Sequence, residues 1–152
     1  MVEAFLRDEF EKVEKCEELD EIGCSISMPN EFNPFNWEAV FIGPESSAYH
    51  GGFFKMNIKF PKNYPQSKPD VYFTTKIFHP NVRNDGYICI KSLNEWVKDR
   101  SMIEVLMSIY ILLMNPNPNN PYNSEAANLY NNNKNEYNKK VNEYVRKYAL
   151  IK

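Results

Sequence analysis

The stretch Phe53-Phe54-Lys55-Met56-Asn57-Ile58-Lys59-Phe60 alternates apolar and polar side chains. Successive residues of a strand point to opposite faces, so Phe54, Met56, Ile58 and Phe60 fall on one face. Lysine and asparagine occupy the other face. This alternation predicts a strand over residues 53–60, with one side in a core and one side in solvent.

Three further apolar runs surround this strand. Cys24, Ile26 and Met28 alternate with serines, and shorter runs cover 37–42 and 71–74. Glycine and proline turn signals at 43–44, 51–52 and 61–69 separate the runs. Connections this short favour an antiparallel meander of four strands.

Helical spacing flanks the strands on both sides. A charged amphipathic segment predicts a helix over 2–18, and Ser101 to Glu104 forms a capping box for a helix that ends before the proline-rich run 115–118. Next we expect a short helix through Tyr130, capped by Asn123 or Ser124, and then a last amphipathic helix. The outline is α+β: an N-terminal helix, a four-stranded antiparallel meander, an active-site loop and three C-terminal helices. We expect residues 1–152 to form a single domain.

Composition limits the function classes. The chain has 152 residues, 43% of them hydrophobic, and a net charge of −2 without a long basic run, so no nucleic-acid footprint is expected. No apolar stretch is long enough for a bilayer, and the charged first residues lack an apolar targeting core. Three cysteines without metal-site spacing favour a reducing compartment, the cytosol or nucleus, with neither disulfides nor zinc.

Residues 75–100 show no clean periodicity, and long irregular segments in compact domains are often functional. They contain His79-Pro80-Asn81 and, eight positions after Asn81 (89 − 81), Cys89. A thiol can accept an acyl group as a thioester, and a nearby carboxamide can stabilise the oxyanion that forms during transfer. The segment therefore indicates an acyl carrier.

Several motifs together resemble the ubiquitin-conjugating enzyme family over nearly the whole chain. They are Phe60-Pro61-Lys62-Asn63-Tyr64-Pro65 with Pro69, His79-Pro80-Asn81, Gly86-Tyr87-Ile88-Cys89, Trp96, and Pro116-Asn117-Pro118 with Pro121 and Ala126-Ala127. The resemblance implies that Cys89 accepts ubiquitin, or a related modifier, from an ATP-dependent activating enzyme. It would pass the modifier to a ligase cysteine or a substrate lysine. It implies no metal or organic cofactor, because the thioester stores the activation energy.

The resemblance also suggests roles for other residues. Asn81 would stabilise the oxyanion or support the active loop, and both roles stay open. His79 would be structural rather than a general base, Pro80 would fix the backbone before Asn81, and Trp96 belongs to the same structural set. Met107 and Ile111 are candidates for contact with the carried modifier, with a core role as the alternative. Ser25 matches a position where some relatives bind a second ubiquitin, although a plain exposed serine is the simpler interpretation.

The chain departs from the family pattern beside the site. Lys91 stands where many active relatives have an aspartate, and Asn120 stands where they have an acidic residue. An anion would help an incoming lysine to bind and lose its proton, whereas a cation opposes the ammonium. We therefore expect weak direct transfer to lysine and favour a ligase cysteine as the acceptor. Lys91 could also be a self-modification site.

The predicted partner surfaces depart as well. The two loops expected to contact the ligase lack the residues usual in the family and carry Gln66, Val97 and Lys98 instead. Phe5 of the first helix is expected to flank these loops. The first helix is acidic where relatives are basic, which reduces or reverses the usual charge complementarity with the activating enzyme. The alternative function is a non-catalytic adaptor that binds ubiquitin. The presence of Cys89 argues against this alternative, whereas Lys91 and Asn120 are compatible with it. A cysteine hydrolase is a weak third possibility, and we expect a monomer.

Overall fold

The computed structural model describes residues 1–150 and confirms the predicted α+β fold. Its four strands are β1 (Cys24–Ser27), β2 (Asn36–Ile42), β3 (Phe53–Lys59) and β4 (Asp70–Phe73). They form one antiparallel sheet in the order β1-β2-β3-β4, which is the predicted meander. Met56 of β3 pairs with Ala39 of β2 on one side and with Phe73 of β4 on the other.

The predicted single helix over 2–18 is wrong. Two helices occupy this region, α1 (Val2–Glu14) and α2 (Glu17–Glu21), and Cys16 between them has an extended backbone. Leu6 and Val13 are buried on one stripe of α1, and Leu19 of α2 is buried too. In an unbroken helix of 3.6 residues per turn, Leu19 would point about 120° away from Val13. The break turns Leu19 back toward the core.

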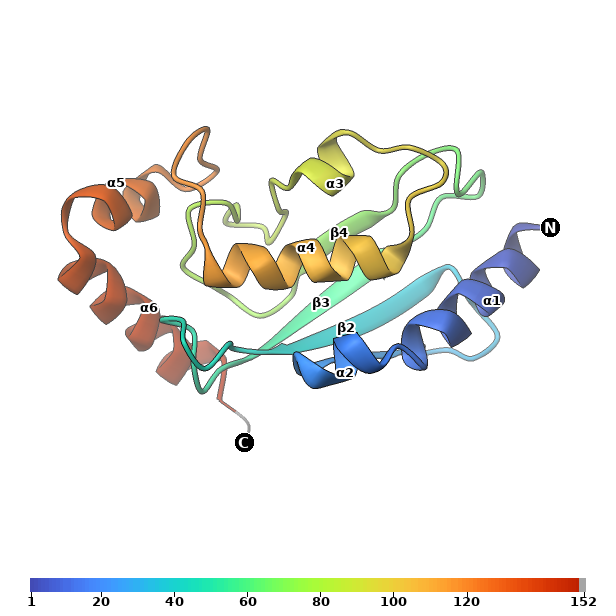
Figure 1. Cartoon of the computed structure of the whole chain (residues 1–152), viewed down its shortest axis with the longest axis horizontal. Helices are drawn as coiled ribbons and strands as arrows, with labels where there is room; N and C mark the ends of the chain where they lie inside the picture. The colour runs from blue at the N-terminus through green and yellow to red at the C-terminus, as the bar shows by residue number, and fades with distance from the viewer. Residues whose placement is uncertain (151–152) are drawn as a thin grey trace.

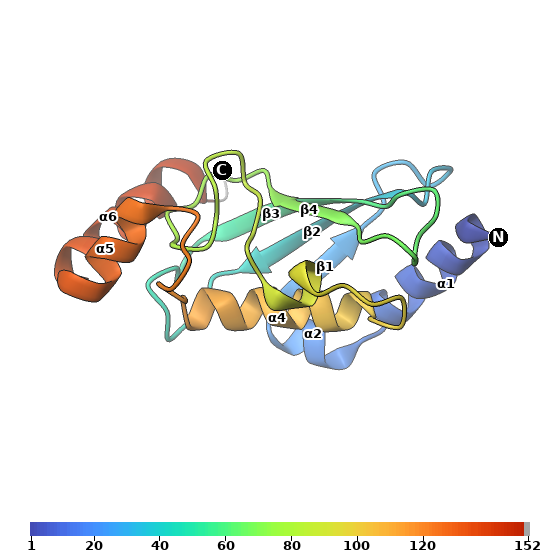
Figure 2. The same ribbon diagram turned by 90° about the horizontal axis from the view of Figure 1, so that it is seen from above.

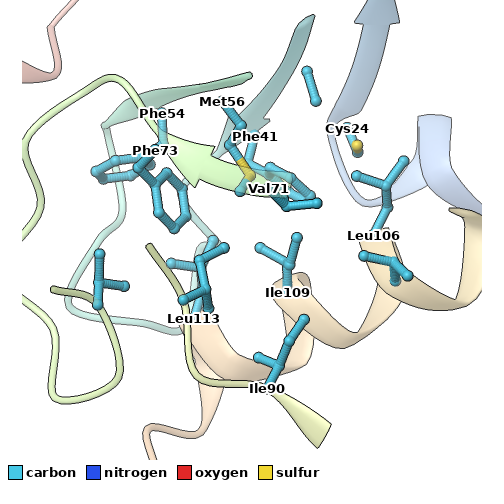
Figure 3. Packing of buried hydrophobic residues seen from close by; sticks show 14 of the residues in the cluster. Cys24, Phe41, Phe54, Met56, Val71, Phe73, Ile90, Leu106, Ile109 and Leu113 are labelled. Atoms are coloured by element: carbon cyan, nitrogen blue, oxygen red, sulfur yellow. The ribbon is translucent and has the colours of Figure 1, made fainter. Parts of the chain in front are cut away.

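Helix α4 (Met102–Met114) packs across one face of the sheet, as Figure 1 shows. Its Leu106, Ile109 and Leu113 point toward Phe41, Met56 and Phe73 of the strands (Figure 3). One half of the predicted capping box is present, since Ser101 Oγ accepts a hydrogen bond of 3.2 Å from the Glu104 N–H. The Glu104 carboxylate instead lies 3.9 Å from Arg100, and within residues 1–150 it accepts no hydrogen bond from the Ser101 N–H. This packing buries the apolar face that the 53–60 alternation predicted.

Helices α5 (Ser124–Asn132) and α6 (Lys134–Tyr148) close the end of the molecule opposite α1 (Figures 1 and 2). Asn123 caps α5 and Asn133 caps α6, each through its side-chain oxygen. The run of asparagines at 131–133 therefore makes the junction between the helices. Within residues 1–150, no helix is long and apolar enough to cross a membrane.

The segment between β4 and α4 is mostly irregular, as predicted, but it contains one short helix, α3 (Lys91–Asn94). An isolated bridge between Tyr72 and Tyr87 holds the segment against the edge strand β4, and a second bridge, between Val82 and Ile88, closes a turn within the segment. Gly86 lies between them with φ +93°, and a side chain there would collide with the carbonyl oxygen of Phe73. This turn sets the path of the chain toward Cys89.

Candidate active site

Backbone hydrogen bonds fix Cys89 in the loop. Its N–H donates to the Asn81 carbonyl at 2.9 Å, one residue after the Val82–Ile88 bridge. The thiol is free and half-buried, whereas Cys24 is buried. Burial raises the pKa of the Cys24 thiol to about 12, which makes Cys24 a poor nucleophile. Cys89 thus presents a reachable sulfur on a fixed backbone.

The Asn81 carboxamide is held at both ends by one residue. Its Nδ2 donates to the Asn117 carbonyl at 2.7 Å, and its Oδ1 accepts from the Asn117 N–H at 2.9 Å. The side chain is buried, and no hydrogen bond within residues 1–150 joins it to the Cys89 sulfur. These contacts favour the loop-support role over direct oxyanion contact. Sequence reasoning missed Asn117 as the partner, because nothing local links positions 36 residues apart.

His79 is fully buried and uses both ring nitrogens. Nδ1 accepts from the Asn81 N–H at 2.9 Å, so Nε2 carries the proton and donates to the Leu112 carbonyl, also at 2.9 Å. The ring stacks on Tyr49 with centroids 5.5 Å apart. Burial lowers the pKa of His79 to about 4, although the hydrogen bond to Leu112 opposes the shift. The imidazole is neutral, and both of its nitrogens are already hydrogen-bonded. These contacts favour a structural role for His79 over the role of a base for Cys89.

Cys89 opens onto a shallow cavity of about 230 Å³ between the active loop and α4. The lining residues are Cys89, Ile90, Lys91, Ser92, Ser108, Ile111, Leu112, Asn115 and Asn117. None of these carries a carboxylate. The Lys91 side chain is 84% exposed, and its Nζ lies 3.9 Å from Glu95 Oε2. Ser92 is buried in the same wall, and its hydroxyl has no hydrogen-bond partner within the described residues.

Asn94 contributes a side-chain hydrogen bond to the Cys89 sulfur. Its Nδ2 lies 3.4 Å from Cys89 Sγ and donates to it. Asn94 ends α3, so one helical turn separates it from the loop that carries Cys89. Sequence reasoning missed this residue. A carboxamide five positions after a nucleophile becomes informative only when the intervening residues are known to form a turn.

The other predicted site residues are distributed over three regions. Ile111 is 54% exposed and lines the Cys89 cavity, whereas Met107, one turn earlier, is half-buried against the core. Asn120 is exposed, adopts the left-handed conformation with φ 54°, and does not line the cavity. Ser25 is exposed on β1, where its neighbours Cys24 and Ile26 are more deeply buried. The structure therefore brings Lys91 and Ile111 to Cys89 but not Asn120 or Ser25.

The predicted ligase-facing residues gather at one end of the molecule. Trp96 Nε1 donates to the Pro65 carbonyl at 2.9 Å and joins the two loops. Tyr64 packs between Trp96 and Phe5, with ring centroids 5.8 and 5.9 Å away. Gln66, Val97 and Lys98 are exposed beside this aromatic cluster. On α1, Lys12 pairs with Asp8 at 3.2 Å, and acidic residues outnumber basic ones along the helix, so α1 carries a net negative charge.

Within residues 1–150, no group of three or more histidine, cysteine or acidic side chains is placed to hold a metal ion. The site as described is a thiol, its supporting carboxamides and a groove.

Comparisons with known proteins agree with this geometry. A family model described as "Ubiquitin-conjugating enzyme" matches residues 6–145, so the chain belongs to the ubiquitin-conjugating enzyme family. The chain is similar to a crystal structure from Plasmodium yoelii described as a ubiquitin-conjugating enzyme, with 30% identity and a TM-score of 0.85. That match covers 98% of this chain and 96% of the other. A ubiquitin-conjugating enzyme domain from Toxoplasma gondii is 27% identical with a TM-score of 0.85, and that match covers 98% and 99% of the two chains.

Membership of the family implies partners of three general kinds: ubiquitin, an activating enzyme and a ligase.

Proposed function

We propose that the protein is an active ubiquitin-conjugating enzyme that carries ubiquitin, or a related modifier, as a thioester on Cys89. The modifier arrives from an ATP-dependent activating enzyme. It leaves to a ligase cysteine or to a substrate lysine. The observation that carries this proposal is the half-buried Cys89 thiol on a fixed loop, beside a groove of about 230 Å³. An extended peptide tail needs such a groove to reach the sulfur.

The site residues divide the work. Cys89 is the nucleophile, and Asn81 holds its loop through Asn117. His79 and Pro80 support Asn81 from the buried side, since the histidine ring accepts the Asn81 N–H. Ile111 offers an exposed apolar side chain beside the groove for the carried modifier. Phe5, Gln66, Val97 and Lys98 form the candidate ligase surface around Trp96.

We propose a thiol as the preferred acceptor. The groove wall near Cys89 supplies the exposed cation Lys91 and no carboxylate among its lining residues. A lysine acceptor must lose its proton near the thioester, and a nearby ammonium disfavours its approach. A ligase cysteine attacks as a thiolate and has no need of a carboxylate there. Transfer to lysine would then need a partner that supplies the missing acid.

A charging assay tests the proposal. The protein is incubated with ATP, ubiquitin and a ubiquitin-activating enzyme, and gels are run with and without reductant. Cys89→Ala is compared with Cys16→Ala, since Cys16 is also a half-buried free thiol. An adduct that reductant removes, absent in Cys89→Ala and present in Cys16→Ala, supports the proposal. An adduct that persists in Cys89→Ala contradicts it, and no adduct with any modifier favours the adaptor.

A second candidate is a non-catalytic adaptor that binds ubiquitin and assists a partner conjugating enzyme. Lys91 beside Cys89 and Asn120 outside the cavity both stand where relatives have acidic residues, and these departures favour it. Stimulation of a partner enzyme that is equal for the protein and for Cys89→Ala would distinguish this function from the first.

The proposal also covers the domain organisation, oligomeric state and cellular location of the enzyme. Residues 1–152 would serve as a single catalytic core domain and act as a monomer in the cytosol or nucleus. The acidic face of α1 suits a dedicated activating enzyme with a basic docking surface, or a modifier other than ubiquitin.

A further inference from the structure

The Cys89 sulfur has a neighbouring hydrogen-bond donor that the family pattern does not explain. Asn94 Nδ2 lies 3.4 Å from Sγ and donates to it. The Asn94 backbone is fixed, because its N–H donates to the Ile90 carbonyl at 2.9 Å. The next N–H, from Glu95, donates to the Lys91 carbonyl at 2.8 Å. The carboxamide is therefore held near the sulfur by a hydrogen-bonded turn that starts beside Cys89.

We propose that Asn94 is a catalytic residue whose carboxamide stabilises negative charge on the Cys89 sulfur during thioester chemistry. The inference rests on the proposed conjugating function and adds a residue to its site. A neutral thiol or thioester sulfur is a weak acceptor, whereas a thiolate is a charged and stronger one. The hydrogen bond therefore strengthens as charge develops on sulfur, which is the condition for lowering a barrier.

When the thioester is discharged to an acceptor, the bond changes place negative charge on the Cys89 sulfur. The acceptor thiolate or amine attacks the thioester carbonyl carbon and forms a new bond to it. The carbon–sulfur bond to Cys89 then breaks, and its electron pair returns to Sγ. If the acceptor is an amine, it also gives up a proton to solvent or to a partner base. Asn94 touches the atom that receives the electron pair, and no oxidant or reductant is needed.

Other polar groups near Cys89 are arranged differently. The Asn81 carboxamide is bound to the Asn117 backbone, and the His79 ring bonds to Asn81 and Leu112. Lys91 extends along α3 toward Glu95, at 3.9 Å. Within the described part of the chain, Asn94 is thus the side chain with a hydrogen bond to Sγ.

Alkylation of the free enzyme tests the inference without any modifier. Iodoacetamide modification of the Cys89 peptide is followed by mass spectrometry at pH 7 and pH 10 in wild type, Asn94→Leu, Asn94→Asp and Asn142→Leu. Asn142 is an exposed helical asparagine of α6 and controls for the same chemical change. At pH 7 we expect Asn94→Leu to react about three- to tenfold more slowly, the size of one hydrogen bond. At pH 10, where solution thiols are ionised, its rate should equal or exceed that of wild type.

The outcomes separate a charge effect from an access effect. The inference is supported if Asn94→Leu slows alkylation at pH 7 but not at pH 10, if Asn94→Asp has a larger effect, and if Asn142→Leu has none. Equal rates at both pH values overturn it, and so does equal slowing at both, because that indicates altered access to the sulfur. Discharge of the charged enzyme to free cysteine should slow by a similar factor in Asn94→Leu. If wild type cannot be charged, the proposed function fails, while the alkylation rates still decide the role of Asn94.

Discussion

The buried imidazole of His79 is expected to make the fold sensitive to mild acid. Burial lowers the pKa of His79 from 6.5 to about 4 in the folded protein. Protonation of Nδ1 would also replace the acceptor that receives the Asn81 N–H. As the pH falls through 6.5, the unfolded chain therefore binds a proton on this side chain and the folded protein does not.

The direction and size of the change in the free energy of unfolding follow from this difference in proton binding. Between pH 6.5 and pH 4 the unfolded state binds more protons, so the free energy of unfolding falls as the pH is lowered. From pH 7 to pH 4.5 the loss from His79 amounts to about 2 kcal/mol, since each pKa unit corresponds to about 1.4 kcal/mol. Well above pH 6.5 the imidazole is neutral in both states, and its contribution is constant.

Urea unfolding at pH 7 and pH 4.5 measures this loss. His79→Gln is less stable at both pH values because it loses packing and hydrogen bonds, so the informative quantity is the change between the two pH values. That change should be about 2 kcal/mol smaller in His79→Gln than in wild type. His50→Gln removes an exposed histidine and should behave as wild type. An identical pH dependence in all three proteins would refute the argument that burial holds His79 neutral.

Three further predictions concern single substitutions. Ser92→Ala should raise the free energy of unfolding by about 1 kcal/mol, because it removes a buried hydroxyl that has no hydrogen-bond partner within residues 1–150, and a lower melting temperature would contradict this. Gly86→Ala should destabilise the fold by more than about 2 kcal/mol in urea unfolding, since φ is +93° and the new methyl group meets the Phe73 carbonyl. Gly51→Ala, with φ +89° but open space around it, is the matched control and should cost about 1 kcal/mol. Lys91→Asp should speed discharge of the charged enzyme to free lysine several-fold and leave discharge to free cysteine nearly unchanged; equal effects on both acceptors would disprove the acceptor preference.

The sequence predicted the parts of the fold that depend on local periodicity. The alternation through Met56 identified the central strand and its buried face, and Ser101 marked the start of α4. The break between α1 and α2 could not be predicted in this way, because it depends on where Leu19 must point to reach the core. Periodicity within residues 2–18 is compatible with one helix, and packing against the sheet decides between one helix and two.

For the site, the motifs identified Cys89 and Asn81 as candidates but not how they are held. Asn81 is bound by Asn117, which is 36 positions away and follows α4 in the chain. Asn94 reaches the sulfur only because residues 91–94 form a helical turn. The first contact arises from tertiary structure, and the second arises from a short helical turn in a segment whose sequence shows no clean periodicity.

The departures from the family pattern lie on the surface, and this separates the question of fold from the question of partners. Lys91, Gln66 and Val97 are exposed, whereas the matching residues His79 and Tyr64 are buried. A buried side chain is constrained by the volume and the hydrogen bonds around it, so its replacement destabilises the fold. An exposed side chain away from such contacts changes stability little and acts mainly through what binds it. The fold can therefore match a relative with a TM-score of 0.85 at 30% identity, while the proposed differences in acceptor and partners would depend on the surface beside Cys89 and on the ligase loops.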